Sequence, residues 1–200
     1  MSVDERTVAL YDARASEYAS RFGKVDAPSK SQAIFLERLP EGGRILDLGC
    51  GPGMSALKFQ KAGFEVDPVD ASEGMIAVAR EAGLPARVAT FDDVDEVAAY
   101  DGVWANFSLL HAAREDLPRY LAAIARALRP GGVLHIGMKL GEGTERDGID
   151  RRYTYVTRAE LEGLIAPLGF EICGAKEFEE EGFAGTLDPC IVMLWQKTDG

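Results

Sequence analysis

Residues Arg44 to Phe59 read RILDLGCGPGMSALKF, and this stretch decides the fold. A short apolar strand (Ile45, Leu46 and Leu48) leads into a turn with three glycines, and a helix begins directly after the turn. Glycine lets the backbone turn sharply and approach a ligand closely, and the free N–H groups of the following helix point to the same place. Asp47 lies within the strand, although a buried parallel strand is expected to be apolar on both faces. The stretch therefore predicts a ligand site at the carboxyl end of this strand.

Composition narrows the class of protein. The chain has 200 residues, 46% of them hydrophobic and 28% charged, which suits a folded α/β domain rather than a disordered chain. A net charge of −11 repels phosphate backbones, so a nucleic-acid partner is disfavoured. Cys50, Cys173 and Cys190 show no CxxC and no paired spacing, which fits a reducing compartment and predicts no metal site. We find neither a signal-peptide pattern nor a run of about 18 apolar residues, and expect a cytoplasmic protein without membrane contact.

Strands and helices alternate in the middle of the chain. After the glycine turn, the apolar pattern and the stop signals predict helices at Met54–Ala62, Ser72–Ala82 and Arg114–Leu128, and strands at Phe64–Val69, Arg87–Thr90, Tyr100–Leu109 and Val133–Met138. Such alternation favours a parallel sheet with helices on both faces.

The two ends of the chain differ from this middle part. An apolar helical stripe runs from Val8 to Phe22, and a second helix follows Pro28. The tail predicts a long polar loop at Gly141–Arg152, a helix from the N-cap Thr157 to Leu168, and an antiparallel hairpin of Glu171–Phe178 and Cys190–Gln196 joined by a loop at 179–189.

Polar residues follow the ends of the predicted strands. The glycine turn ends the first strand, and the later strands end at Asp70, Asp92, Asn106 and Lys139. Because the carboxyl ends of parallel strands meet at one edge of an open sheet, these residues are expected to line one ligand site.

The spacing of the glycines separates two kinds of cofactor. A dinucleotide fingerprint is G-x-G-x-x-G, whereas this chain has G-x-G-x-G with Met54 in the place of the last glycine. A pyrophosphate would be repelled by Asp47, while a ligand with an ammonium group would be attracted to it. The turn therefore favours a cofactor that carries an amino acid, and Asp70 suits the hydroxyl groups of its ribose.

These motifs resemble one known family. Asp47 to Gly53 (DLGCGPG), the run Asp70-Ala71-Ser72 with Met75, and the later run ALRPGGVLHIG resemble the class I S-adenosylmethionine-dependent methyltransferases over roughly residues 5–175. The resemblance implies a Rossmann-like methyltransferase fold of the α/β class. Its seven-stranded, mostly parallel, doubly wound sheet has one antiparallel strand and a helical N-terminal cap. It also implies a single domain over 1–200, with the cap at 1–43, the cofactor-binding core at 44–139 and the acceptor side at 140–200.

The resemblance also assigns roles to residues of this chain. Asp47 and the glycine turn hold the methionine end of S-adenosylmethionine, Asp70 binds the ribose, and Asp92 accepts from the adenine amino group. The N-terminal helix lids the site. The cofactor-binding residues implied in this way are Tyr11, Tyr18, Arg21, Asp47, Gly49, Cys50, Gly51, Asp70, Ala71, Met75, Phe91, Asp92, Asn106 and Phe107.

The acceptor side is less well defined by the sequence. The resemblance is to compact members that act on small molecules, by direct displacement in a dry site. His111 is the one candidate for a catalytic general base, although a structural role at a helix start is the alternative. An anionic or aromatic substrate would suit the basic and aromatic residues Lys139, Arg146, Arg151 and Tyr153; a solvated loop of internal ion pairs is the other interpretation.

Two other functions compete with methyl transfer. One is a non-catalytic S-adenosylmethionine-binding or regulatory protein of the same fold. The other is an NAD(P)-dependent oxidoreductase, which Met54 and Asp47 oppose.

Overall fold

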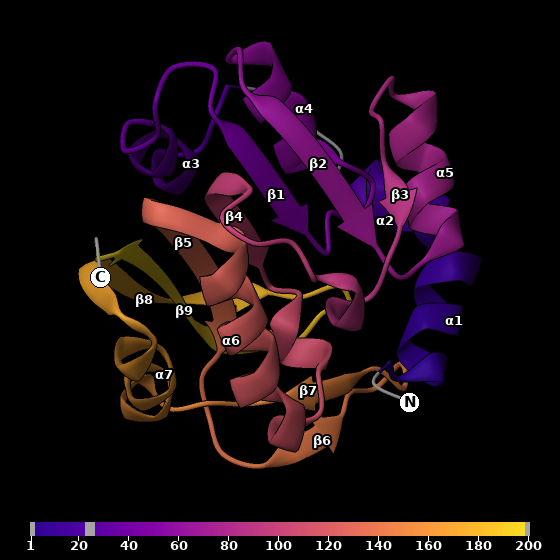
Figure 1. Ribbon diagram of the computed structural model, residues 1–200. Coiled ribbons are helices and arrows are strands. Elements are labelled where there is room, and N and C mark those ends of the chain that lie inside the picture. Colours follow the sequence, from indigo (N-terminus) through magenta and orange to yellow (C-terminus); the bar gives the residue numbers. More distant parts are fainter. Residues whose placement is uncertain (1–2, 23–26, 199–200) are drawn as a thin grey trace.

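A seven-stranded sheet forms the centre of the structure, a computed structural model that describes residues 3–22 and 27–198 (Figure 1). The strand order is β3-β2-β1-β4-β5-β9-β8. The first five strands in the chain are parallel, and β9 runs antiparallel to both β5 and β8. The strands are β1 (Arg44–Leu48), β2 (Glu65–Asp70), β3 (Arg87–Val88), β4 (Tyr100–Asn106), β5 (Leu128–Lys139), β8 (Phe170–Glu181) and β9 (Leu187–Lys197). The predicted mostly parallel sheet with one antiparallel strand is confirmed.

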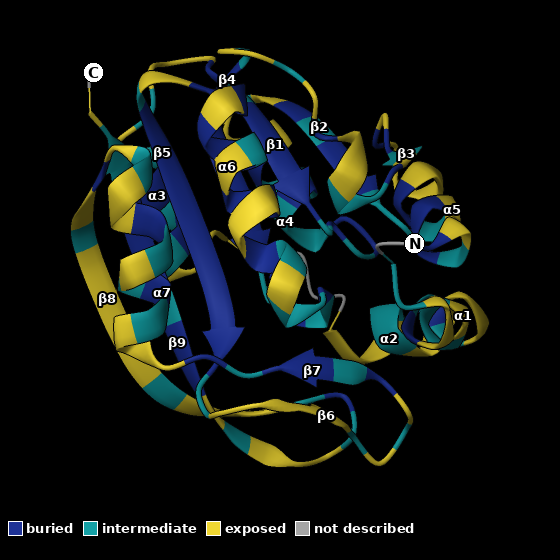
Figure 2. Cartoon of the chain, turned by 60° about the horizontal axis from the view of Figure 1, so that its bottom comes forward, coloured by how far each residue is buried: buried dark blue, intermediate teal, exposed yellow. Residues whose placement is uncertain are grey.

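Helices cover both faces of this sheet because successive side chains of each strand point to opposite faces. On one face, α3 (Lys30–Leu36), α4 (Met54–Lys61) and α5 (Glu73–Glu81) pack in a cluster with Ile45 and Trp104. On the other face, α6 (Leu117–Ala127) and α7 (Arg158–Ile165) pack in a cluster with Leu46 and Val103. Figure 2 shows β5 buried over most of its length, with α6 and α7 exposing their outer sides.

The N-terminal cap consists of two helices rather than one continuous stripe. α1 (Glu5–Ala13) and α2 (Ala15–Phe22) are separated at Arg14, and both lie against α5 (Figure 1). The carboxylate of Asp12 accepts hydrogen bonds from Ser72 Oγ at 2.6 Å and from the Gly74 N–H at 3.0 Å. The cap is therefore anchored at the start of α5. Residues 1–2 and 23–26 of the predicted 1–43 cap, and residues 199–200 of the predicted last segment, lie outside the described residues.

The predicted helix starts of α5 and α7 are confirmed. Ser72 caps α5 by accepting from the Met75 N–H at 3.1 Å, and Thr157 caps α7 by accepting from the Glu160 N–H at 3.2 Å. These short-range bonds satisfy N–H groups that have no partner inside the helix, which is why the sequence alone reveals them.

Three predictions about the strands are wrong. The Gly141–Arg152 loop contains a small antiparallel sheet of β6 (Thr144–Arg146) and β7 (Arg152–Thr154); β6 is exposed and polar, so no apolar alternation marks it. The fourth strand ends at Asn106 instead of Leu109 because Phe107, with φ +57°, turns the chain into a 3₁₀ helix at Leu109–His111. β8 and β9 extend through most of the predicted 179–189 loop and leave a turn at 182–186.

Within the described residues, the structure contains no helix with both the length and the apolar character needed to cross a membrane.

Candidate active site

A cavity of about 370 Å³ opens at the carboxyl ends of β1, β2 and β4. The strand order reverses between β1 and β4, the place where open α/β sheets bind ligands. The cap helices and the turn between β8 and β9 supply the rest of the wall. The predicted site residues that line this cavity are Tyr11, Tyr18, Asp47, Gly49, Cys50, Gly51, Asp70, Ala71, Met75, Phe91, Asn106, Phe107, His111, Lys139, Arg151 and Tyr153.

The glycine turn is shaped by a close approach to the end of β4. Gly49 has φ +77°, and a Cβ atom on it would lie 2.3 Å from the Cβ of Ser108. Ser108 Oγ in turn donates to the Leu48 carbonyl at 2.6 Å. The first glycine is therefore required both for its left-handed backbone and for the space it leaves between the two strand ends.

Asp70 joins the ends of β1 and β2. Its Oδ2 accepts from the Gly51 N–H and its Oδ1 from the Ser72 N–H, both at 2.9 Å. Burial raises the pKa of the Asp70 carboxyl above its usual value. Each carboxylate oxygen has a second lone pair, so Asp70 can accept ligand hydroxyl groups without losing these bonds.

Asp47 is the most unusual polar residue of the cavity. Its side chain is 2% exposed, and its Oδ2 has no hydrogen-bond partner among the described residues. Burial, with a further contribution from nearby Asp70, raises the pKa of the Asp47 carboxyl to about 7. A buried carboxylate oxygen without a partner is costly, and a ligand ammonium group would satisfy it. The chemistry of this residue fits the amino-acid end of S-adenosylmethionine.

Asn106, at the end of β4, is held by a buried histidine. The Asn106 Oδ1 lies 2.9 Å from His135 Nε2, and the His135 ring stacks on Trp104 at 3.6 Å between ring centres. Burial lowers the pKa of His135 to about 3, so the ring is neutral and carries its proton on Nε2 to donate to Asn106. His135 is thus structural, and it orients a cavity residue.

His111 has both ring nitrogens engaged. Its Nδ1 lies 2.7 Å from the Arg152 carbonyl and therefore carries the proton, which leaves Nε2 to accept from the Tyr11 hydroxyl at 2.9 Å. The same hydroxyl accepts from Arg151 Nη1 at 2.8 Å. Burial, together with Arg151 and Lys139 nearby, lowers the pKa of His111 to about 4. His111 lines the cavity as a neutral, fully hydrogen-bonded ring, which is a poor arrangement for the general base predicted from the sequence.

Two buried cations form the wall opposite the glycine turn. Lys139 Nζ lies 2.7 Å from Asp188 Oδ2 and 3.7 Å from the centre of the Tyr153 ring. Arg151 is 2% exposed and donates to Asp147 Oδ2 from Nε at 2.9 Å and from Nη2 at 2.7 Å. This side of the cavity is therefore rigid, because each cation is held by its own carboxylate.

Three predicted site residues lie outside the cavity lining. Arg21 donates to the Phe183 carbonyl at 3.0 Å, on the outer side of the β8–β9 turn. Asp92 lies in a 3₁₀ turn and pairs with Arg119, while the neighbouring Phe91 lines the cavity. Arg146, predicted as a substrate-binding residue, instead pairs with Asp4 of the cap at 2.6 Å. In each case another residue of the protein holds the side chain.

The turn between β8 and β9 contributes cavity residues that the sequence does not identify. Phe183 is 5% exposed and packs on Tyr18, with 5.1 Å between ring centres, and on Phe22 at 6.1 Å. Cys190, in β9, also lines the cavity. The available signal was a single aromatic residue, Phe183, inside the acidic and glycine-rich run EEEGFAG.

Known proteins match this chain in sequence. The family described as "Methyltransferase domain" matches residues 45–132. The putative methyltransferase YqeM of Bacillus subtilis is 33% identical over 146 residues, which cover 66% of this chain and 58% of the relative. Trans-aconitate 2-methyltransferase of Variovorax paradoxus is 41% identical over 111 residues, which cover 50% of this chain and 40% of the relative. The matched region thus spans about half the length of these two curated relatives.

Solved structures match the fold. The 1,6-didemethyltoxoflavin-N1-methyltransferase of Burkholderia thailandensis, solved with 1,6-didemethyltoxoflavin and S-adenosylhomocysteine, has a TM-score of 0.76 and 24% sequence identity. The match covers 97% of this chain and 88% of that one. The predicted Rossmann-like methyltransferase fold is thereby confirmed. By its motifs and its sequence relatives, the chain is similar to the class I S-adenosylmethionine-dependent methyltransferases.

Proposed function

We propose that this chain binds S-adenosylmethionine in the cavity and transfers its methyl group to a small-molecule acceptor by direct displacement. The observation that carries the proposal is the buried Asp47 carboxylate: its Oδ2 has no partner among the described residues, and Asp47 lines the same cavity as Asp70. The family match and the relatives that are named as methyltransferases support it.

Residues around the cavity have separate tasks in this proposal. Asp47 binds the ammonium group of the cofactor, Asp70 accepts from its ribose hydroxyls, and Met75 with Phe91 packs on its adenine. Asn106, oriented by His135, lies on the side of the sulfur atom. S-adenosylmethionine supplies a methyl group on a cationic sulfur when it is bound. The protein then has to align the acceptor and exclude water, which is the main source of rate in such a displacement.

The partner and the location follow the same proposal. We infer a small-molecule acceptor because the cap helices and the β8–β9 turn both contribute to the wall of the cavity. A net charge of −11 supports the absence of a nucleic-acid substrate. A cytoplasmic location is supported by the free thiols of Cys50, Cys173 and Cys190.

Calorimetry with S-adenosylhomocysteine tests the cofactor assignment. We expect the wild-type protein to bind it and not to bind NAD. In Asp70→Ala, the affinity should fall about tenfold or more, because ribose hydroxyls lose a charged acceptor. The matched control is Asp95→Ala, an exposed aspartate that does not line the cavity. Binding of S-adenosylhomocysteine that is unchanged in Asp70→Ala would contradict the assignment of this site.

A further inference from the structure

We propose that the methyl acceptor is an organic anion whose nucleophilic oxygen, a carboxylate or an acidic phenol, is ionised before it binds, and that Lys139 positions this oxygen. The inference rests on the proposed methyl transfer and specifies the substrate class of the same cavity. Its basis is the arrangement of charges and of hydrogen-bond donors on the wall opposite the glycine turn.

The two cations of this wall face the cavity, whereas their carboxylate partners do not. Lys139 and Arg151 line the cavity, but Asp188 and Asp147, which pair with them, lie outside its lining. Each ion pair is therefore oriented with its positive end toward the bound acceptor. In a buried site with little water, such an orientation attracts an anion much more strongly than it would in solution.

Lys139 keeps donors for a ligand. An ammonium group has three N–H donors, and one of them is directed to Asp188 Oδ2 at 2.7 Å. The neighbouring Tyr153 ring, 3.7 Å from Nζ, holds the group in place without using a carbonyl or carboxylate acceptor. The remaining N–H groups can donate to an acceptor oxygen. More of the N–H donors of Arg151 are occupied, because they donate to Asp147 Oδ2 and to the Tyr11 hydroxyl.

Most titratable side chains near Lys139 are engaged, as far as the described residues show. His111 has both nitrogens engaged, and burial lowers its pKa to about 4. Asp4 pairs with Arg146, an interaction that helps to lower the pKa of its carboxyl to about 2. Glu180 and Glu181 of β8 also line the cavity; Glu181 pairs with Arg21, and burial raises the pKa of the Glu180 carboxyl. An alcohol or an amine would therefore depend on Glu180 as its base, whereas an oxygen that is already ionised needs none.

The chemistry of the step agrees with these observations. A bond forms between the acceptor oxygen and the methyl carbon, and the carbon–sulfur bond breaks with its electron pair passing to sulfur. The oxygen loses its negative charge, the sulfur loses its positive charge, and no proton is released. Because both charges decrease on the way to the product, a site that excludes water favours this reaction.

The body of the acceptor is expected to be flat and apolar. Tyr18, Phe22 and Phe183 gather with their rings in contact and all line the cavity. Aromatic rings of this kind pack well on planar ligands. Suitable probes are therefore aromatic acids and the neutral amides of the same shape, in which an NH2 group replaces one charged oxygen: benzoate with benzamide, and cinnamate with cinnamamide.

The experiment measures binding of these pairs by calorimetry to the protein saturated with S-adenosylhomocysteine. We expect at least one acid to bind about tenfold or more tightly than its amide. Lys139→Gln should abolish this preference, and Lys139→Arg should keep it. The matched control is Lys176→Gln on the outer strand β8, an exposed lysine outside the cavity lining. Failure of S-adenosylhomocysteine to bind the wild type would count against the proposed function itself.

A variant of the partner residue distinguishes ligand binding from a merely structural ion pair. Asp188→Asn frees the Lys139 ammonium, so affinity for the acid should stay the same or rise. If the ion pair is only structural, affinity for the acid should fall both in Lys139→Gln and in Asp188→Asn. The double variant Lys139→Gln/Asp188→Asn removes both charges together and avoids leaving an unpaired buried carboxylate; it should fold and show no preference for the acid. Equal affinity of acid and amide for the wild type, no binding of any probe, or a preference that survives Lys139→Gln would overturn the inference.

Discussion

At the scale of single residues, the buried Asp47 carboxylate lowers the stability of the ligand-free protein, and it is the residue that we propose to bind the cofactor. The β1 strand that carries it is otherwise buried and apolar, with Leu46 and Leu48 packed in the core. A carboxylate at this depth destabilises the protein when no ligand is bound, since charge is removed from water without a counter-ion. Such local destabilisation is expected of a residue that is retained for a ligand.

The first prediction concerns the pH dependence of this cost. The pKa of Asp47 is about 7 in the folded protein and about 3.9 in an unfolded chain, so the folded state binds more protons between these values and its stability falls as pH rises through this window. Asp47→Asn does not titrate. Its free energy of unfolding relative to wild type should therefore increase by about 2–3 kcal/mol from about pH 5 to about pH 8.

Urea unfolding of the two ligand-free proteins at both pH values measures this difference, and other titrating groups cancel in the comparison. The same substitution should weaken binding of S-adenosylhomocysteine, because the ammonium group loses its carboxylate. A stability difference that does not depend on pH would show that Asp47 is ionised in the folded protein without cost.

At the scale of elements, the helix α1 is held on the small β6–β7 sheet by polar contacts. Asp4 pairs with Arg146 at 2.6 Å, and Thr7 Oγ1 accepts from the Arg152 N–H at 2.9 Å. One turn further along, the Tyr11 hydroxyl accepts from Arg151. The cap thus forms one side of the cavity wall through contacts with residues 146–152, which lie far away in sequence. The contacts named here are hydrogen bonds and an ion pair rather than apolar packing.

The second prediction is that Asp4→Ala loosens this contact. Asp4 is also the N-cap of α1 and accepts from the Thr7 N–H at 2.9 Å, so its loss should cost about 1–2 kcal/mol locally. Hydrogen exchange of amides in α1 should become about tenfold faster. Glu5→Ala is the control, since Glu5 lies in the same first turn and is exposed. Equal exchange rates in the two variants would indicate that apolar packing on α5, rather than Asp4, holds the helix.

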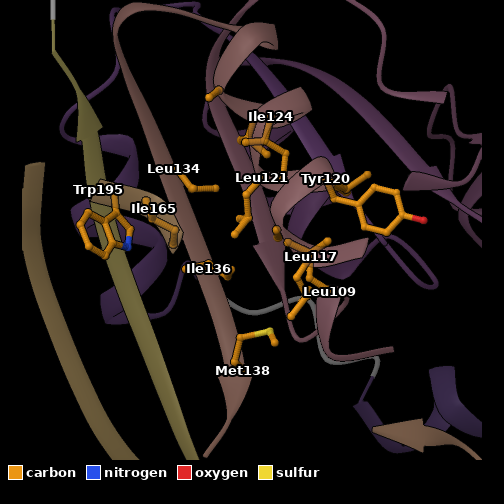
Figure 3. Packing of buried hydrophobic residues seen from close by; sticks show 14 of the residues in the cluster. Leu109, Leu117, Tyr120, Leu121, Ile124, Leu134, Ile136, Met138, Ile165 and Trp195 are labelled. Atoms are coloured by element: carbon orange, nitrogen blue, oxygen red, sulfur yellow. The ribbon is translucent and has the colours of Figure 1, made fainter. Parts of the chain in front are cut away.

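At the scale of the whole molecule, two clusters of buried apolar residues, on opposite faces of the sheet, stabilise the fold. Figure 3 shows the larger cluster, in which Leu121 and Ile124 of α6 face Leu134 and Ile136 of β5. The cavity lies at the strand ends, where Leu48, Leu110 and Tyr153 of this cluster also line it. Ile124 belongs to the cluster but not to the cavity lining, so stability can be changed at this position separately from binding.

The third prediction tests this separation. Ile124 is fully buried, so Ile124→Ala should lower the free energy of unfolding by about 2–5 kcal/mol through lost burial and a residual cavity. Affinity of the folded protein for S-adenosylhomocysteine should change less than about twofold. Urea unfolding and calorimetry give the two values, and Val97→Ala, at a site 70% exposed, should leave both nearly unchanged. A large loss of affinity in Ile124→Ala would mean that the core and the site are coupled.

Features of the fold and the site that depend on neighbouring residues in sequence could be predicted. The glycine turn, the caps at Ser72 and Thr157, and the alternation of strands and helices are set by backbone geometry and apolar periodicity within a few residues. The parallel sheet then brings Asp47, Asp70 and Asn106 to one edge, because parallel strands of one sheet end on the same side. The sequence by itself determined the fold and the meeting of Asp47, Asp70 and Asn106 at one cavity.

Tertiary structure alone decided which side chains face the acceptor. Arg146 and Lys139 are both basic residues that follow or end β5, but Arg146 pairs with Asp4 and does not line the cavity, while Lys139 does. Both ring nitrogens of His111 are engaged, by Tyr11 and by Arg152, and Phe183 lines the cavity from a turn that the sequence presents as a loop. The physical reason is common to all of these residues. Their partners lie far away along the chain, and a long-range hydrogen bond or ion pair leaves no local pattern in the sequence.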